Sequence, residues 1–298
     1  MFYLAVSILL SVLLLVNFRL FPRFGINTTH AISLNYVVCF GLGFLLIPEK
    51  QTLVLDFKQD WTWYCLALGV GFIITFILSG LSTQKAGMTA TSLANNLSLI
   101  IPVLASLLLY NTHVRQFDFA NYLGLLLGIV AVGLASFQKT RGGSIKGNLW
   151  LPLAVFTMYG ITNSAINYIN LRFIPDPEKV IPVTLVMVLG ALVSGLLLFL
   201  YRLVAHKDKL EIKNLIAALS LGIPNFLSFY FLILTLTAFG NSGAFVYPIY
   251  NIGVIVFSAV IGIFFFKEQL SSINKYGLLL GLAAIALISW QELAALIR

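Results

Sequence analysis

Uncharged polar side chains inside long apolar stretches are the groups of this sequence best suited to bind a ligand. Two such stretches, residues 88–110 and 243–266, carry amides and hydroxyls. These are Asn95, Asn96 and Ser98 in the first stretch and Tyr247, Tyr250 and Asn251 in the second. Polar groups in an apolar environment cost free energy unless they are paired, so we expect them to line a cavity. The alternative is hydrogen bonding between helices, worth roughly 1 kcal/mol per contact in membranes.

A polar stripe is predicted on a helix over residues 149–171. Its members are Tyr159, Asn163, Asn167 and Asn170, whose spacings of 4, 4 and 3 residues place them on one helix face. In the stretch 214–236, Asn225 and Tyr230 are expected to complete this polar surface. We interpret the stripe as a contact surface for a ligand, with helix packing as the alternative.

Three prolines fall inside or beside these polar segments, namely Pro102, Pro224 and Pro248. Proline has no backbone N–H, so the carbonyl four residues earlier loses its helical donor. Pro102 frees the carbonyl of Ser98 in this way, and Pro248 frees that of Ala244. We therefore expect helix breaks or gating points at the three prolines.

The sequence shows no pattern of an enzyme, a metal centre or a cofactor site. The histidines, His30, His113 and His206, fall at the ends of apolar stretches or between them, and no His-Glu-x-x-His or Gly-x-Ser-x-Gly motif is present. Both cysteines stand alone in apolar stretches, without metal-ligand spacing. Glu268 is expected to cap the linker in which it lies. Since no basic cluster lies within an apolar stretch to pair with a phosphate dianion, the expected ligand is neutral or zwitterionic.

The composition is that of a membrane protein. Of 298 residues, 60% are hydrophobic and 9% charged, and the mean hydropathy is +0.99. The net charge of +8 comes from singly scattered basic residues, which argues against nucleic-acid binding. A bilayer core of roughly 30 Å needs about 20 helical residues. Ten stretches are long enough: 2–18, 30–47, 63–83, 88–110, 120–138, 149–171, 180–201, 214–236, 243–266 and 275–291. Because lipid offers no partner to open backbone groups, we predict an all-α membrane protein with ten transmembrane helices.

The two halves of the chain are related by a register of 153 residues. It pairs Asn17 with Asn170, Arg19 with Arg172, Gly87 with Gly240, Asn121 with Asn274 and Gly124 with Gly277. Each half holds five stretches, an odd number, so the second half enters the membrane from the opposite side. The sequence thus predicts two inverted five-helix repeats, residues 1–145 and 146–298. Such repeats are typical of secondary transporters, which open alternately to either side of a central site.

The polar stripe is not shared between the halves. In the 153-residue register, Asn163 corresponds to Leu10 and Asn167 to Leu14. A group required by the fold should occur in both repeats, whereas a ligand needs only one copy of its binding group. The asymmetry favours ligand contact for these asparagines.

One segment resembles a known family. Residues 266–271, Phe-Lys-Glu-Gln-Leu-Ser, followed by a helix with Gly277 and Gly281, resemble the Gly-Glu-x-Leu linker and last span of EamA-type transporters in the drug/metabolite transporter superfamily. Phe266 or Lys267 stands in place of the usual glycine, and the first-half linker at 111–115 lacks the glutamate. The resemblance implies ten spans in two repeats, cytoplasmic termini and a metabolite or amino-acid carrier, usually an exporter.

These observations lead us to expect a uniporter or exchanger that moves a small metabolite through a bacterial inner membrane by alternating access. Membrane lipids are its surroundings, and nothing in the sequence requires more than a monomer. A lipid flippase on the same fold is the main alternative, and a structural membrane subunit is a third. The loops after odd-numbered stretches hold 12 of the 18 Lys and Arg residues, among them Arg19, Lys85 and Lys267. The positive-inside rule puts those loops in the cytoplasm and both termini outside, opposite to the family resemblance.

Overall fold

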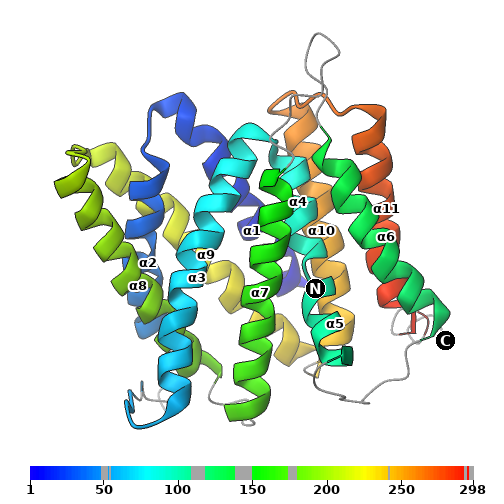
Figure 1. Ribbon diagram of the computed structural model, residues 1–298, viewed down its shortest axis with the longest axis horizontal. Helices are drawn as coiled ribbons and strands as arrows, with labels where there is room; N and C mark the ends of the chain where they lie inside the picture. The colour runs from blue at the N-terminus through cyan, green and yellow to red at the C-terminus, as the bar shows by residue number, and fades with distance from the viewer. Residues whose placement is uncertain are drawn as a thin grey trace. The chain divides into compact units, whose positions relative to one another are not determined.

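All regular secondary structure in the described residues of this computed structural model is helical (Figure 1). The structure describes residues 1–47, 53, 55–108, 118–137, 150–173, 180–240, 242–291 and 294. The helices are α1 (Phe2–Leu20), η1 (Phe21–Phe24), α2 (Thr28–Leu45), α3 (Asp60–Lys85), α4 (Met88–Leu97), α5 (Ile100–Leu108), α6 (Phe119–Ser136), α7 (Trp150–Phe173), α8 (Val180–Ala205), α9 (Ile212–Ala238), α10 (Gly243–Phe264) and α11 (Ser272–Ile288). Each apolar stretch predicted from the sequence coincides with one of them, except that residues 88–110 contain two.

The break between α4 and α5 lies at Ser98 and Leu99. Pro102 has no N–H for the Ser98 carbonyl, which instead accepts from the backbone N–H of Ile101 at 3.0 Å. Pro224 and Pro248, by contrast, lie inside the continuous helices α9 and α10. A proline therefore coincides with a helix boundary at only one of the three positions where we expected a break.

Eight helical segments of the described chain are long and apolar enough to cross a bilayer, as expected of a multi-pass membrane protein. They are α1 with η1, α2, α3, α4 with most of α5, α6, most of α8, α9 and most of α10. Helix α11 is apolar but has only 17 residues, and α7, which carries the asparagine stripe, is not among the eight. The count of ten spans stays a prediction.

The chain forms two compact units, which we describe separately. Unit 1 contains residues Met1–Arg19, Leu78–Gly160 and Ser228–Arg298, and unit 2 contains Leu20–Ile77 and Ile161–Leu227. The boundaries between them fall before the last residue of α1 and inside α3, α7 and α9. Each unit draws on both sequence halves, so the units are not the repeats 1–145 and 146–298. The repeats describe similarity along the chain, whereas the units describe contact in space.

In unit 1, helices α6 and α11 lie side by side in antiparallel orientation (Figure 1). The Asn121 side chain, in the first turn of α6, donates to the Ile288 carbonyl at the end of α11, 2.8 Å away. Reciprocally, the Asn274 side chain, in the first turn of α11, donates to the Ala135 carbonyl near the end of α6, 3.0 Å away. These two contacts are equivalent in the 153-residue register. Each asparagine thereby donates to a carbonyl in the last turn of the neighbouring helix, where carbonyls have no donor within their own helix.

The same two asparagines fix the beginnings of their own helices. Asp118 precedes α6 and Ser271 precedes α11, and each forms a capping box with the asparagine three residues later. In a capping box, each side chain accepts from the backbone N–H of the other residue, which satisfies two donors that have no helical partner. Each asparagine side chain thus serves both its own helix and the neighbouring one.

Glycines let α6 and α11 approach closely. A Cβ atom on Gly124 would lie 2.8 Å from the backbone nitrogen of Ile288, and one on Gly277 would lie 2.8 Å from that of Ala135. Both distances are shorter than any ordinary carbon contact. Small residues at a helix interface are the means by which membrane helices gain van der Waals contact.

Unit 2 is built around α2, α8 and the adjoining parts of α3, α7 and α9. Its apolar core is formed by Cys65, Leu68, Ile169, Val183, Val186 and Met187. Helices α3 and α8 approach closely at Gly69 and Gly190, where an added side chain would meet the opposite backbone. Cys39 and Cys65 are both buried and free.

We predict that Gly124→Ala and Gly277→Ala each lower the free energy of unfolding by about 1–3 kcal/mol, because the added methyl group overpacks the α6–α11 contact. The measurement is denaturation of the detergent-solubilised protein, by heat or by titration with a denaturing detergent. Gly133→Ala is the matched control, since a Cβ atom there meets nothing within 4 Å. Equal losses in all three variants would contradict the role of close helix approach.

Candidate functional site

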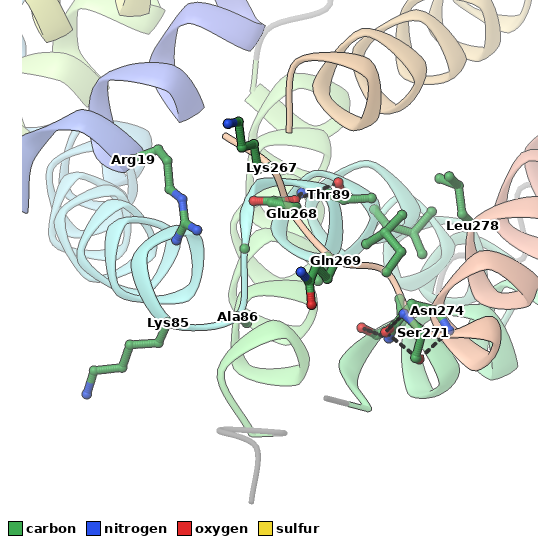
Figure 2. Close-up of a pocket in the computed structure, with 15 residues that line it drawn as sticks. Arg19, Lys85, Ala86, Thr89, Lys267, Glu268, Gln269, Ser271, Asn274 and Leu278 are labelled. Carbon is green, nitrogen blue, oxygen red and sulfur yellow. Dashed lines mark hydrogen bonds between the residues drawn. The ribbon is translucent and has the colours of Figure 1, made fainter. Parts of the chain in front are cut away.

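Unit 1 contains a cavity of about 470 Å³ beside the first turn of α4 (Figure 2). Its rim carries four charged side chains: Arg19 from α1, Lys85 from α3, and Lys267 and Glu268 from the segment between α10 and α11. Its apolar wall includes Ala90, Leu93, Ala135 and Leu278, from α4, α6 and α11. The cavity is therefore amphipathic, with a charged rim and an apolar wall.

Glu268 caps the first turn of α4. One carboxylate oxygen accepts from the backbone N–H of Met88 at 2.5 Å, and the other accepts from the N–H and the hydroxyl of Thr89 at 3.2 and 2.8 Å. The residue before α4, Gly87, has a φ of 99° and no side chain that could serve as a cap. A carboxylate at this end also interacts favourably with the helix dipole.

Glu268 is therefore a cap, as we predicted, but it caps a different segment from the one expected. We expected it to cap its own linker. The residue that caps the helix after the linker, α11, is instead Ser271, and Glu268 caps α4, 180 residues earlier in the chain. Sequence patterns reveal caps three or four residues away, so this long-range contact had no local signal.

Arg19 is held by the end of α3. Its Nη1 donates to the carbonyls of Thr83 and Gln84, at 3.2 and 2.9 Å. These carbonyls belong to the last turn of a helix, where intrahelical donors are missing and positive charge is favoured. Within the described residues, the Nε and Nη2 donors of Arg19 have no partner. The guanidinium is thus fixed in place by Nη1 while Nε and Nη2 stay available.

Lys85 and Lys267 complete a group of three cations around the cavity. Both side chains are exposed, and neither forms an ion pair or hydrogen bond within the part of the chain that the structure describes. The three cations come from different parts of the chain, so no single apolar stretch contains a basic cluster. A signal was nevertheless present, since all three residues end odd-numbered stretches or follow them and so belong to the same predicted face.

The predicted ligand-binding residues of α4 bond largely to their own helix. Asn96 donates to the Ser92 carbonyl at 2.7 Å, and the Ser98 hydroxyl donates to the Asn95 carbonyl at 2.5 Å. Asn96 and Ser98 are buried and Asn95 is half-buried. Helices α4 and α10 pack together, and Ser92 donates to the Val254 carbonyl between them at 3.3 Å.

Two of the predicted tyrosines lie together in unit 1. The Tyr250 hydroxyl shares a 2.7 Å hydrogen bond with that of Ser11, joining α10 to α1, and Tyr159 of α7 lies near Tyr250 and Ser79. Tyr247 is 46% exposed, whereas Asn251 is buried. Ser11, which is not among the predicted ligand-binding residues, therefore also belongs to this polar group.

The remaining predicted residues lie in unit 2. Asn225 of α9 donates to the Asn35 side chain of α2 at 2.8 Å, and Asn163 and Asn167 are half-buried on α7. Each of the two α7 asparagines has an interaction of its own. The ten predicted side chains are thus distributed over both units, and their convergence on one ligand stays a prediction.

Unit 2 also contains a buried histidine, His30, whose burial its position at the end of an apolar stretch did not predict. His30 in the first turn of α2 is completely buried, and its Nε2 lies 3.1 Å from Asp208 Oδ2. The same oxygen accepts from Arg202 Nε at 2.9 Å and from the Asn27 side chain at 3.2 Å. Asn27 is itself the N-cap of α2. The Asp208 carboxylate, in the loop between α8 and α9, thus contacts both the N-cap and the first turn of α2.

These contacts determine the charge state of Asp208. Partial removal from water alone raises the pKa of its carboxyl group, but the Arg202 guanidinium, His30 and the Asn27 amide outweigh that effect, and the pKa is lowered. The carboxylate is therefore the form that the folded unit favours. No group of three His, Cys, Asp or Glu side chains that could hold a metal ion occurs in the described residues.

Comparison with known proteins indicates a fold but no activity. No protein-family model matches the chain. The chain is 28% identical over 288 residues, 94% of each chain, to an uncharacterized protein of Haemophilus influenzae. It is also similar to a protein of known crystal structure, with a TM-score of 0.55 and 15% sequence identity over 98% of each chain. At that identity, the similarity concerns the fold alone.

We predict that Glu268→Ala lowers the free energy of unfolding by about 1–2 kcal/mol, because α4 loses both its cap and the charge at its first turn. Thermal unfolding of the purified protein measures the loss. Glu211→Ala is the matched control, since Glu211 forms an exposed pair with Lys213 at 2.6 Å. Removing that pair should cost less than about 1 kcal/mol. Unchanged stability in Glu268→Ala would show that α4 does not depend on this cap.

Asp208 should make the stability of unit 2 depend on pH in the acidic range. A carboxyl group whose pKa is lowered by folding stabilises the protein above its unfolded value of about 4. That contribution is lost as the pH falls through the lower folded value. We expect Asp208→Asn to be less stable than the wild type at neutral pH and to lose stability less steeply below about pH 4. Unfolding curves across this range test the prediction, with the exposed Asp60→Asn as control, and parallel wild-type and Asp208→Asn profiles would contradict it.

Proposed function

We propose that this protein is a secondary transporter with ten membrane spans, in which two inverted five-helix repeats alternately expose a central site. The observation that supports this most strongly is the reciprocity of the α6–α11 contacts. Asn121 bonds to Ile288 as Asn274 bonds to Ala135, and both asparagines take part in capping boxes. An element that contacts its own counterpart in antiparallel orientation is what inverted repeats produce around a two-fold axis in the membrane plane.

Other features of the chain agree with the same arrangement. Gly87 and Gly240, which correspond in the register, both have positive φ, 99° and 63°. Each ends the turn after a long helix, a position where glycine adopts this conformation without strain. Together with the resemblance of residues 266–271 to the EamA-type linker, these features support membership of the drug/metabolite transporter superfamily as our proposal.

The cargo we propose is a small neutral or zwitterionic metabolite resembling an amino acid, with export as the direction. The polar groups of α4, α7, α9 and α10 are amides and hydroxyls, which form hydrogen bonds with such a molecule without adding net charge. Tyr250, which bonds to Ser11, and Tyr159 near it add aromatic surface. A bacterial inner membrane is the proposed location.

We propose that transport is not coupled to protons through Glu268. Its two carboxylate oxygens together accept three hydrogen bonds from the first turn of α4, which supports a structural role. Cargo would then move down its own gradient by uniport or exchange.

A lipid flippase is the second candidate function, and the amphipathic cavity favours it. Charged side chains at the rim and Leu93 and Leu278 in the wall match a molecule with a polar headgroup and an apolar tail. The two candidates differ in what proteoliposomes move. A metabolite carrier exchanges radiolabelled solute across the bilayer, whereas a flippase transfers a fluorescent phospholipid between the leaflets.

The decisive experiment is counterflow in proteoliposomes, screened over amino acids and common metabolites, with a pH dye to detect accompanying proton movement. We predict that Asn163→Leu or Asn167→Leu lowers uptake by tenfold or more, because an unpaired polar group on the cargo costs roughly 1 to 3 kcal/mol. Leu10→Ala and Leu14→Ala, the counterparts in the other repeat, should affect stability more than transport. Equal transport defects in both pairs would mean that the asparagines serve packing. A stoichiometric proton flux that is absent in Glu268→Gln would contradict uncoupled transport.

A further inference from the structure

We propose that the cavity beside α4 binds a phosphate group, held by Arg19 and flanked by Lys85 and Lys267. This site is separate from the polar residues to which we assign the cargo. It stands whether or not the protein is a transporter, because it is a statement about equilibrium binding to residues of unit 1 alone. The group belongs either to a membrane lipid headgroup or to free phosphate in solution.

The orientation of Arg19 is the first observation behind this inference. Both of its hydrogen bonds to the described part of the chain use Nη1, which donates to the carbonyls of Thr83 and Gln84. The opposite edge, with Nε and Nη2, has no partner within the described residues. On that edge two N–H groups point in parallel in the plane of the guanidinium. Such a pair of donors binds two oxygens of a carboxylate or phosphate at once. Because α3 already fixes the side chain, an anion would find this edge pre-oriented.

The charge balance of the rim is the second observation. Glu268 is paired with three donors of α4, so its negative charge is already compensated locally. Three cations and one carboxylate leave two net positive charges around the cavity. Inorganic phosphate and a monoester lipid such as phosphatidic acid carry about −1.5 to −2 at pH 7, which matches that excess better than a single carboxylate does. Positive charge around a cavity that no acidic group among the described residues compensates favours an anionic ligand.

The lysines supply charge without a fixed direction. Figure 2 shows Lys85 and Lys267 extending outward from the rim, on either side of Arg19 and Glu268. A lysine ammonium group sits on a flexible stem and binds phosphate as a point charge rather than through fixed geometry. Gln269 lies at the same rim and carries an amide donor. Arg19 would therefore set the geometry, and the lysines would strengthen the attraction.

The apolar wall distinguishes the two sources of phosphate. Ala90, Leu93, Ala135 and Leu278 offer no hydrogen bond to an inorganic ion, but they can pack against the glycerol and first methylene groups of a lipid. A lipid phosphate should consequently bind more tightly than free phosphate. Equal affinity would identify soluble phosphate as the ligand.

The experiment uses the full chain in a nonionic detergent and two probes. One arm titrates inorganic phosphate, and the other titrates a short-chain phosphatidic acid, with the matching phosphatidylcholine as reference, both by calorimetry. We expect saturable binding that weakens with added salt and is tighter for phosphatidic acid than for either of the others. If neither phosphate nor phosphatidic acid binds, the proposal is wrong.

Variants then locate the site. Lys85→Gln and Lys267→Gln, both at exposed positions, should each weaken binding by about fivefold, and Arg19→Lys by about tenfold, because it keeps the charge but loses the paired donors. Lys275→Gln is the matched control, an exposed lysine of the same unit that does not line the cavity, and should change affinity less than twofold. The thermal unfolding of each variant verifies folding. If Lys275→Gln weakens binding as much as Lys267→Gln, the attraction is diffuse and the assigned cavity is wrong.

Discussion

Pairing of backbone polar groups is the constraint on which the rest of this structure depends. A helix leaves its first N–H groups and its last carbonyls without internal partners, and lipid offers none in their place. In this protein, side chains from distant segments fill that need. Glu268 accepts from a backbone N–H in the first turn of α4, and Arg19 donates to a carbonyl in the last turn of α3. Asp208 accepts from the side chain of Asn27, the N-cap of α2. Charged and amide side chains of this apolar chain thus stabilise several helix beginnings and ends.

The same requirement explains why α6 and α11 are joined so closely. Asn121 and Asn274 each begin one helix and pair the end of the other, and Gly124 and Gly277 allow the backbones to meet. A contact of this kind needs both helices to present equivalent residues in antiparallel orientation. Duplication followed by inversion would provide that equivalence at once, which is why we regard the contact as support for the inverted repeat.

Hydrogen bonding within the protein and ligand binding draw on the same small set of polar groups. Asn96, Ser98 and Asn225 each donate one hydrogen bond to the protein already, so fewer of their polar atoms remain for a cargo. Arg19 differs, because the geometry of guanidinium lets one nitrogen cap α3 while the others stay available. A residue recruited for stability can in this way keep donors for a ligand.

The sequence by itself determined the helical membrane character, the approximate positions of the helices and the 153-residue register that the α6–α11 contacts follow. Those properties depend on hydropathy, on span length and on periodicity, which are local or repeat at fixed spacing. Only the tertiary structure decided that Glu268 caps α4, that His30 is buried against Asp208, and that Arg19, Lys85 and Lys267 surround one cavity. Each of these facts joins residues far apart in the chain. No local pattern specifies such a pairing, because it depends on which helix ends packing brings together.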